Sequence, residues 1–374
     1  MALLKYCTKC WMPETRPRIT FNSEGVCCAC EWAEEKKRVD WDERRQHLEK
    51  LCATYRKDGK SPDVVVPYSG GKDSIYVAHK MRDLGMTPLL MTVIPHMETE
   101  TGAWNRKNMC PDMERYEINL NEEKYRSLAK KYFIEQGRPK HPWECAISAA
   151  VINQAYRMGI PFIMYGEEGE AEYGGSMQEK DRWMHPASLD YLMQFYYQCG
   201  QLDWTMPDED GYDKMYFTQY SRYENWSPSK HANYAIAAGM RTIPVRNIGT
   251  FTSHSQISDD LQDLHAYLMF VKYGFGRATS DASIAIREGW TDRDSEAIQW
   301  VETYDGEFPN AFLPKYLEYF NMTEAEFSGV IAKHANRNLL ERTHKYIWAL
   351  QPWLSIWRRK DTKLAMINPS RYSY

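Results

Sequence analysis

The sequence lacks a long hydrophobic run, and its cysteines lack the even count of a disulfide framework. No apolar stretch approaches the roughly 18 residues that a membrane-spanning helix needs. The apolar part of residues 1–6 is too short for a signal peptide, so no membrane association is expected. Nine cysteines, an odd number, fit a reducing compartment better than a secreted one. We therefore expect a cytoplasmic protein.

The chain also lacks a strong charge of either sign. Its 47 basic and 51 acidic residues leave a net charge of −4. A protein that holds a long nucleic acid normally presents a strongly basic face, so this balance argues against a nucleic-acid partner. With 374 residues and no internal repeat, the sequence has room for two or three domains.

The most informative motif is a glycine-rich turn between an apolar run and a helical pattern. It reads Pro67-Tyr68-Ser69-Gly70-Gly71-Lys72-Asp73-Ser74. A buried strand that enters such a turn and leaves it as a helix surrounds a phosphate with backbone N–H groups. Gly70 and Gly71 permit the tight turn. Lys72 adds a cation, and Asp73 is placed to act near a metal ion. The alternative is an ordinary turn without a ligand.

This motif lacks the spacing of a Walker A loop. It resembles instead the pyrophosphate loop of the ATP pyrophosphatases. Those enzymes split ATP between the α- and β-phosphates and use the AMP half to activate a carbonyl oxygen. The resemblance implies that the residues from Tyr68 to Ser74 bind ATP.

Two Cys-x-x-Cys pairs lie near the N-terminus. They are Cys7 with Cys10, and Cys27 with Cys30. Their separation is typical of a four-thiolate zinc ribbon, in which each pair supplies one chelating hairpin. Residues 1–35 hold too few apolar side chains to fold alone, so bound Zn²⁺ would stabilise them. Cys28 could replace Cys27, although only Cys27 keeps the two-residue spacing to Cys30. Redox-active cysteines and an iron–sulfur cluster are the alternatives.

The hydrophobic periodicity predicts an α/β fold with a parallel sheet. Strands are expected at 63–68, 87–94 and 159–165, with helices at 73–84, 103–110, 121–136 and 144–158. A strand, a helix and a second strand within about 30 residues form a right-handed βαβ unit. In such sheets ligands bind at the carboxyl ends of the strands, where the 69–74 loop and the 166–169 turn both begin.

The later part of the chain is expected to be mostly helical. Helices are predicted at 228–240, at 258–273 and from 277 to about 359, with a short strand at 242–245. The predicted domains are a zinc ribbon at 1–40, an ATP-binding domain at 41–285 with an aromatic insertion at about 173–227, and a helical C-terminal region at 286–374.

With these motifs placed, the chain resembles the N-acetyl sugar amidotransferases of bacterial surface-polysaccharide and flagellar-glycan biosynthesis over nearly its whole length. The resemblance rests on residues 6–17, 24–27, 68–74, 165–167, 172–175, 272–282, 286–287 and 304–306. The chain departs from the family pattern at Glu168, where related chains often have asparagine. Near residues 141–143 it has only Cys145, where related chains often carry more than one cysteine.

The resemblance implies an adenine nucleotide alpha hydrolase-like fold and an ATP-dependent, AMP-forming amidotransferase. This enzyme would convert the N-acetyl group of a nucleotide-activated sugar to an acetamidino group, in O-antigen or flagellar-glycan biosynthesis. ATP would adenylate the amide oxygen, and Mg²⁺ would bridge the phosphates. Ammonia would come from a separate glutaminase subunit of class I.

The same resemblance implies a role for individual positions. The residues with catalytic roles would be Lys72, Asp73 and Glu167. Gly166 would join the loop in binding ATP. The Mg²⁺ ligands would be Asp73, Glu167 and Glu168. The candidates for sugar contact are Tyr173, Lys272 and Arg277, with a helix-capping turn as the alternative for the last two.

A glutaminase needs a nucleophilic cysteine, and the sequence offers none in a suitable setting. Residue 2 is Ala2, and no cysteine lies in a glycine-rich nucleophile elbow. Cys110 and Cys145 are interpreted as structural. The second hypothesis is a tRNA thiolase, which also joins a zinc ribbon to a pyrophosphate loop but needs a thiol pair or an iron–sulfur cluster. A non-catalytic zinc-ribbon scaffold is the third.

Overall fold

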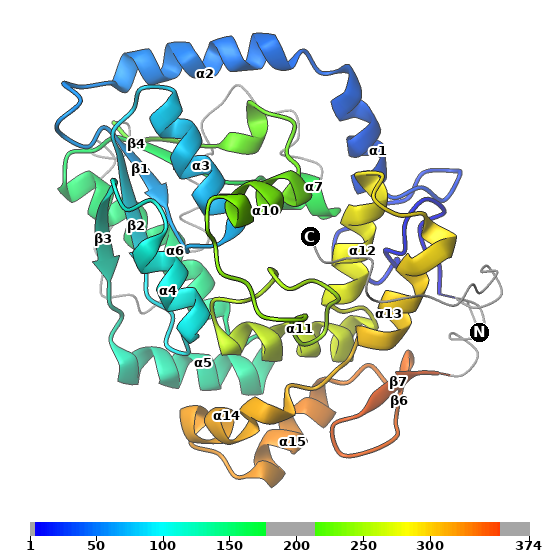
Figure 1. Ribbon diagram of the computed structural model, residues 1–374. Helices are drawn as coiled ribbons and strands as arrows, with labels where there is room; N and C mark the ends of the chain where they lie inside the picture. The colour runs from blue at the N-terminus through cyan, green and yellow to red at the C-terminus, as the bar shows by residue number, and fades with distance from the viewer. Residues whose placement is uncertain (1–3, 177–213, 352–374) are drawn as a thin grey trace.

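The computed structural model describes residues 4–176 and 214–351, and a parallel sheet lies at its centre (Figure 1). Its five strands follow the order β3-β2-β1-β4-β5, and every neighbouring pair is parallel. They are β1 (Val64–Pro67), β2 (Pro88–Val93), β3 (Glu114–Ile118), β4 (Phe162–Tyr165) and β5 (Tyr216–Gln219). The prediction of an α/β fold with a parallel sheet is confirmed.

Helices cover both faces of the sheet because its central strands are apolar on both sides. Those on one face are α2 (Trp41–Tyr55), α3 (Lys72–Asp83) and α10 (Pro228–Ala237), and those on the other are α5 (Glu122–Gln136) and α6 (His141–Arg157). Val64 and Val66 pack with the first group, whereas Val65 packs with the second. This alternation is what a strand with period two produces between two helical layers.

The connections leave the middle of the sheet in opposite directions. From β1 the chain moves outward to β2 and β3, whereas β4 lies on the other side of β1 and leads to β5. A reversal of this kind opens a crevice at the carboxyl ends of the two central strands. The loop after β1 and the turn after β4 therefore start at the same place.

The remaining elements flank this sheet. They are α1 (Cys28–Glu35), η1 (Lys36–Arg38), α4 (Glu100–Asn108), α7 (Gly169–Tyr173), α11 (Asp260–Tyr273), α12 (Arg277–Arg287), α13 (Ile298–Tyr304), α14 (Leu313–Phe320) and α15 (Glu324–His334). In Figure 1, α12 and α13 lie beside the N-terminal segment, and α14 and α15 lie below α5. Across the described ranges, none of the helices has the length and apolar character to cross a bilayer.

Two expectations about secondary structure are wrong. The helices of the C-terminal region end at His334, and an antiparallel hairpin of β6 (Leu340–Arg342) and β7 (Trp348–Leu350) follows. Leu340 and Trp348 are buried in the cluster that also holds Phe327, which explains why this segment packs as a hairpin. Residues 242–245 form no strand. Most of the aromatic insertion lies outside the described residues, and the domain boundaries stay predictions.

Candidate active site and metal centre

The loop after β1 is shaped to hold an anion at the start of α3. Gly70 has a φ of +74°, and a side-chain carbon there would lie 2.5 Å from the backbone N of Arg106. Only glycine satisfies both conditions. The Ser69 hydroxyl accepts a hydrogen bond from the Gly71 N–H at 3.2 Å, and no described side chain caps the N-terminus of α3. The first N–H groups and the helix dipole therefore favour a phosphate.

A cavity of about 270 Å³ opens where the loop and the turn after β4 meet. The predicted ATP-binding residues that line it are Tyr68, Ser69, Asp73, Ser74 and Gly166. Trp143, Ile147 and Val151 of α6 contribute an apolar wall on another side. The cavity is thus polar beside the loop and apolar along α6, where a flat apolar group can lie.

Asp73 is fixed between a cation and a histidine. Its Oδ2 forms an ion pair with the Lys72 ammonium, and its Oδ1 lies 2.9 Å from Nδ1 of His231. Burial would raise the pKa of Asp73, but Lys72 and His231 together outweigh burial and hold this pKa below its ordinary value. The carboxylate therefore keeps its charge. His231 comes from α10, and the sequence analysis missed it.

Glu167 and Glu168 have different surroundings. Glu167 lines the same cavity as Asp73, and burial, followed by the charge of Asp73, raises the pKa of Glu167 to about 7. Two carboxylates that repel each other beside a phosphate loop are a suitable donor set for Mg²⁺. Glu168 instead caps α7, because its Oε2 accepts a hydrogen bond from the Ala171 N–H at 2.7 Å. Asp73 and Glu167 are therefore the carboxylates that fit Mg²⁺.

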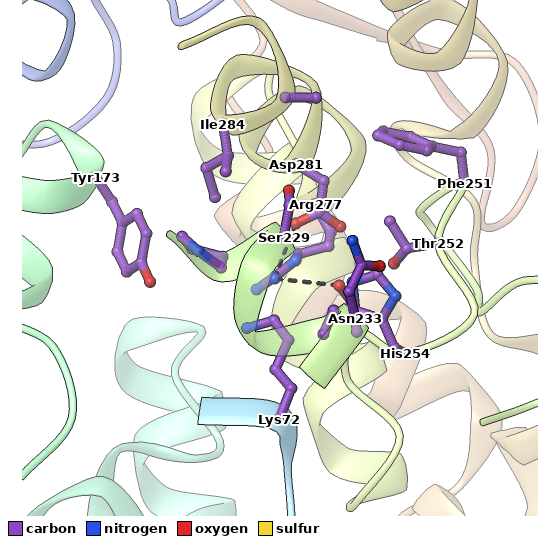
Figure 2. A pocket seen from close by; sticks show the side chains of 14 residues that line it. Lys72, Tyr173, Ser229, Asn233, Phe251, Thr252, His254, Arg277, Asp281 and Ile284 are labelled. Atoms are coloured by element: carbon purple, nitrogen blue, oxygen red, sulfur yellow. Dashed lines mark hydrogen bonds and ion pairs between the residues drawn. The ribbon is translucent and has the colours of Figure 1, made fainter. Parts of the chain in front are cut away.

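A second cavity, of about 50 Å³, adjoins the loop through Lys72 (Figure 2). Figure 2 shows the Lys72 side chain pointing toward Arg277 of α12, with Tyr173 of α7 to one side. Arg277 forms an ion pair with Asp281 at 2.8 Å, a residue that the sequence analysis missed. Burial, and next the charge of Lys72, lower the pKa of His254 in the same wall to about 4. Tyr173 and Arg277 thus lie together beside the loop.

Lys272, the third candidate for sugar contact, lies elsewhere. Its Nζ donates a hydrogen bond to the backbone O of Gln136 at 2.9 Å, and its side chain lines a different cavity together with Arg16 and Arg138. Burial, with a contribution from Arg138, lowers the pKa of Lys272. The turn that joins α11 to α12 therefore separates Lys272 from Arg277.

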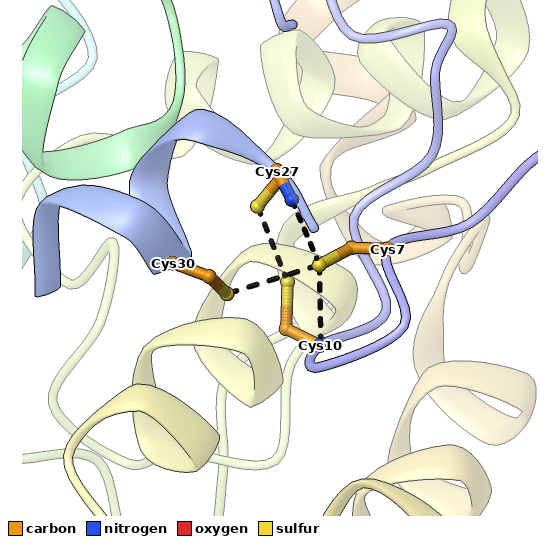
Figure 3. A group of neighbouring side chains, drawn as sticks. All are labelled: Cys7, Cys10, Cys27 and Cys30. Carbon is orange, nitrogen blue, oxygen red and sulfur yellow. Dashed lines mark hydrogen bonds between the residues drawn. The ribbon is translucent and has the colours of Figure 1, made fainter. Parts of the chain in front are cut away.

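The four predicted zinc ligands form one buried cluster (Figure 3). Their Sγ atoms all lie within 4.8 Å of one another, and the Cys7–Cys30 and Cys10–Cys27 pairs are each 3.8 Å apart. A tetrahedral site with Zn–S bonds of about 2.3 Å has sulfur atoms about 3.8 Å apart. The residues present therefore fit a structural zinc ion, and the prediction of an N-terminal zinc ribbon is confirmed as a fold.

The other cysteines with open roles stand apart from this cluster. The Cys28 thiol lies 3.7 Å from the backbone O of Gly175, so Cys27 and not Cys28 belongs to the cluster. Cys110 is buried with its Sγ 3.3 Å from Nε2 of His79, and Cys145 is buried next to His141. Neither of them lines the two cavities at the loop.

Comparison with known proteins gives a family match for part of the chain. Residues 216–354 match the model described as the C-terminal domain of WbpG-like lipopolysaccharide (LPS) biosynthesis proteins. No curated protein matches the chain. One similar solved structure is a predicted subunit of tRNA methyltransferase from Methanocaldococcus jannaschii, at 16% identity and a TM-score of 0.31, which covers 56% of this chain and 88% of that one.

The family match spans β5, α10, α11 and α12, and thus includes His231 and Arg277 beside the loop. The match supports a role in glycan biosynthesis. Residues 216–354 are thus similar to the C-terminal domain of the WbpG-like LPS biosynthesis proteins, and this match supports the resemblance to the N-acetyl sugar amidotransferases.

Proposed function

We propose that this protein is an ATP-dependent, AMP-forming amidotransferase that converts a sugar N-acetyl group to an acetamidino group during bacterial surface-glycan biosynthesis. The observation that carries the proposal is the position of the loop. It lies between a cavity with two facing carboxylates and a second cavity walled by the WbpG-like domain. A nucleotide in the first cavity and the acetamido group of a sugar in the second would meet at Lys72.

The chemistry needs activation because an amide is a poor electrophile. The amide oxygen attacks the α-phosphorus of ATP, the bond to the β-phosphate oxygen breaks, and pyrophosphate leaves. The loop N–H groups and the Lys72 ammonium stabilise the negative charge that develops on pyrophosphate. Asp73 and Glu167 would hold Mg²⁺, which would neutralise the phosphate charge.

Ammonia completes the reaction. It attacks the carbon of the adenylated imidate, and AMP leaves with the former amide oxygen. The product keeps both nitrogens and is a cationic amidine. These steps depend on positioning and electrostatics, so they require no nucleophilic side chain. We further propose that a separate class I glutaminase supplies the ammonia, because no cysteine in the described residues lines the cavities at the loop.

The nucleotide products test this proposal. Asp73→Asn should lower AMP formation by about 100-fold, because it removes a negative charge that the metal ion needs. The change keeps the side-chain volume and one acceptor for His231, so the thermal unfolding temperature should stay close to that of the parent. Products of ADP and phosphate, in place of AMP and pyrophosphate, would overturn the proposal.

The nitrogen source provides a second measurement on the same protein. The isolated chain should form amidine with ammonium salts and should not hydrolyse glutamine. Mass spectrometry of the sugar should show one oxygen replaced by one nitrogen. Replacement of oxygen by sulfur, or activity on tRNA, would favour the thiolase hypothesis instead.

A further inference from the structure

The second cavity, which Lys72 lines, is the Lys72 cavity. Next to it, toward the N-terminal ribbon, lies a third cavity of about 370 Å³. The two cavities share Tyr173, Pro228 and Ile284 in their walls. A ligand that lies in the third cavity can therefore place one group past Tyr173 toward Lys72. None of the roles described so far uses this space.

Tryptophans from three separate parts of the chain line this third cavity. Trp32 comes from α1, Trp226 precedes α10, and Trp290 follows α12. Trp290 leaves 44% of its surface exposed, a large fraction for so apolar a side chain. Flat aromatic faces beside polar groups are suited to the C–H faces and hydroxyls of a pyranose ring. Their convergence on one cavity indicates a ligand with both kinds of surface.

The same wall holds polar atoms that the protein does not satisfy. Both carboxylate oxygens of Glu288 and Nη1 of Arg287 are buried without a hydrogen-bond partner among the described residues. Buried polar groups are almost always paired, so each exception needs an explanation. A sugar hydroxyl would pair with Glu288, and a phosphate oxygen would pair with Arg287.

The zinc ribbon fixes one side of this cavity. Its last ligand, Cys30, lies in the first turn of α1, and the same helix carries Trp32. Trp32 Nε1 donates to Glu172 Oε1 at 3.0 Å, and Lys36 Nζ donates to Glu172 Oε2 at 2.6 Å. Glu172 precedes Tyr173, so the ribbon is joined by direct hydrogen bonds to the wall that the two cavities share.

We propose that the third cavity binds the acceptor as a sugar nucleotide, with the pyranose ring against the tryptophans and the acetamido group directed past Tyr173 toward Lys72. Arg287 binds a phosphate of the carrier, and Glu288 accepts hydrogen bonds from sugar hydroxyls. The ribbon thereby acts as part of the acceptor site. This inference rests on the proposed function, because it takes the acceptor to be an activated N-acetyl sugar.

Binding measured without ATP tests this inference apart from the reaction. The probes are UDP-N-acetylglucosamine and CMP-N-acetylneuraminic acid, titrated into the full chain by calorimetry and followed by saturation-transfer NMR. Glu288→Gln and Trp290→Ala should each weaken binding of the preferred probe about tenfold, the loss expected for a charged hydrogen bond or a stacked ring. Tyr156→Ala on α6 is the control, because Tyr156 is similarly exposed, at 38%, and lies outside this cavity.

The outcomes separate this inference from the proposed function. If neither probe binds the parent protein, the third cavity is not the acceptor site. The same conclusion follows if Trp290→Ala and Glu288→Gln bind the probes as tightly as the parent does. ATP affinity should be unchanged in both variants, and the saturation-transfer signal should fall on the sugar ring protons. If sugar binding follows the expected pattern but no AMP forms with sugar, ATP and ammonium present, only the proposed reaction is wrong.

Discussion

The contact between Asp73 and His231 joins a residue of the loop motif to a residue that the motif does not predict. Asp73 is part of the pyrophosphate loop and was predicted, whereas His231 is 158 positions further along the chain. The two meet because α10 packs on α3, and the His231 ring stacks on Tyr76 with centroids 4.2 Å apart. A lone histidine in a helix carries no signal of this partner. His254, which lies in a loop, and Asp281, which lies in α12, carry no such signal either.

Gly70 provides a test of the loop conformation. Gly70→Ala should destabilise the protein by about 2 kcal/mol or more, because an L-residue is strained at its φ of +74° and the new methyl group would meet the backbone of Arg106. ATP affinity should fall as well. Urea unfolding and ATP calorimetry measure the two effects.

The matched control for this change is Gly59→Ala. Gly59 has a similar φ of +72°, but nothing lies within 4 Å of the added carbon. This variant should lose only about 1 kcal/mol of stability and keep its ATP affinity. Equal effects of the two alanines on ATP binding would contradict the role assigned to the loop.

Asp263 gives the protein a predictable dependence on pH. Burial, and then the charges of Asp260 and Asp259, raise the pKa of Asp263 to about 8. Lys140 forms its ion pair with Asp259, and Lys315 forms its ion pair with Asp260, so neither lysine is paired with Asp263. A folded-state pKa above the unfolded value near 3.9 means that the fold prefers the protonated carboxyl. Its contribution to stability is thus complete below about pH 4 and is lost as the pH rises toward 8.

Asp263→Asn should remove this dependence. The variant should exceed the parent in free energy of unfolding by on the order of 2 kcal/mol at about pH 8, and the difference should shrink toward about pH 4. Urea unfolding at several pH values measures it, with the exposed Asp292→Asn as the control. A difference that stays constant across this range would mean that Asp263 is ionised in the folded protein.

Helices and strands were predictable where their burial is regular. The central strands β1, β2 and β4 are continuous apolar runs and were predicted to within a few residues. β3 was missed because it is an edge strand whose five residues are all partly or fully exposed. β5 lies at the end of an aromatic segment without a clear period. The position of Lys272 could not be read from its sequence neighbour Arg277, because the turn after α11 directs the two side chains into different cavities.

The N-terminal ribbon allows a direct comparison of two adjacent cysteines. Cys27→Ala should abolish binding of one zinc ion per chain and destabilise α1, because it removes a thiolate from the buried cluster. Cys28→Ala should keep the zinc, since the Cys28 thiol lies against the backbone of Gly175. Metal analysis by mass spectrometry and thermal unfolding distinguish the two variants. If Cys27→Ala kept its zinc and Cys28→Ala lost it, Cys28 and not Cys27 would be the zinc ligand.

Three cavities lie next to one another between the central sheet and the ribbon. The first cavity is lined by Asp73 and the second by the adjacent Lys72, and this second cavity shares walls with the third cavity, which lies beside α1. The WbpG-like domain supplies α10 and α12, whereas the sheet supplies the loop. Under the proposed function, neither part alone would hold both substrates. The pyrophosphate loop lies in the first half of the sequence, whereas the match to the WbpG-like domain lies in the second half.

Arg277 and Lys272 provide the test of this arrangement, because both were expected to contact the sugar. Arg277 lines the Lys72 cavity, and its buried Nε has no partner in the described part of the chain. Arg277→Ala should lower amidine formation about tenfold or more, through the loss of a charged hydrogen bond, and leave ATP affinity unchanged. Lys272→Ala should leave the reaction rate close to that of the parent, because Lys272 lines a separate cavity.

Asp281→Asn accompanies these variants, because Arg277→Ala leaves the buried Asp281 carboxylate without its cation. If Arg277→Ala fails only through this unpaired charge, the double variant with Asp281→Asn should recover the activity. We expect the double variant to recover thermal stability but not the rate of amidine formation, because Arg277 lines the cavity proposed for the acetamido group. A Lys272→Ala protein as impaired as Arg277→Ala would mean that the acceptor extends into the cavity of Lys272, and not into the one beside α1.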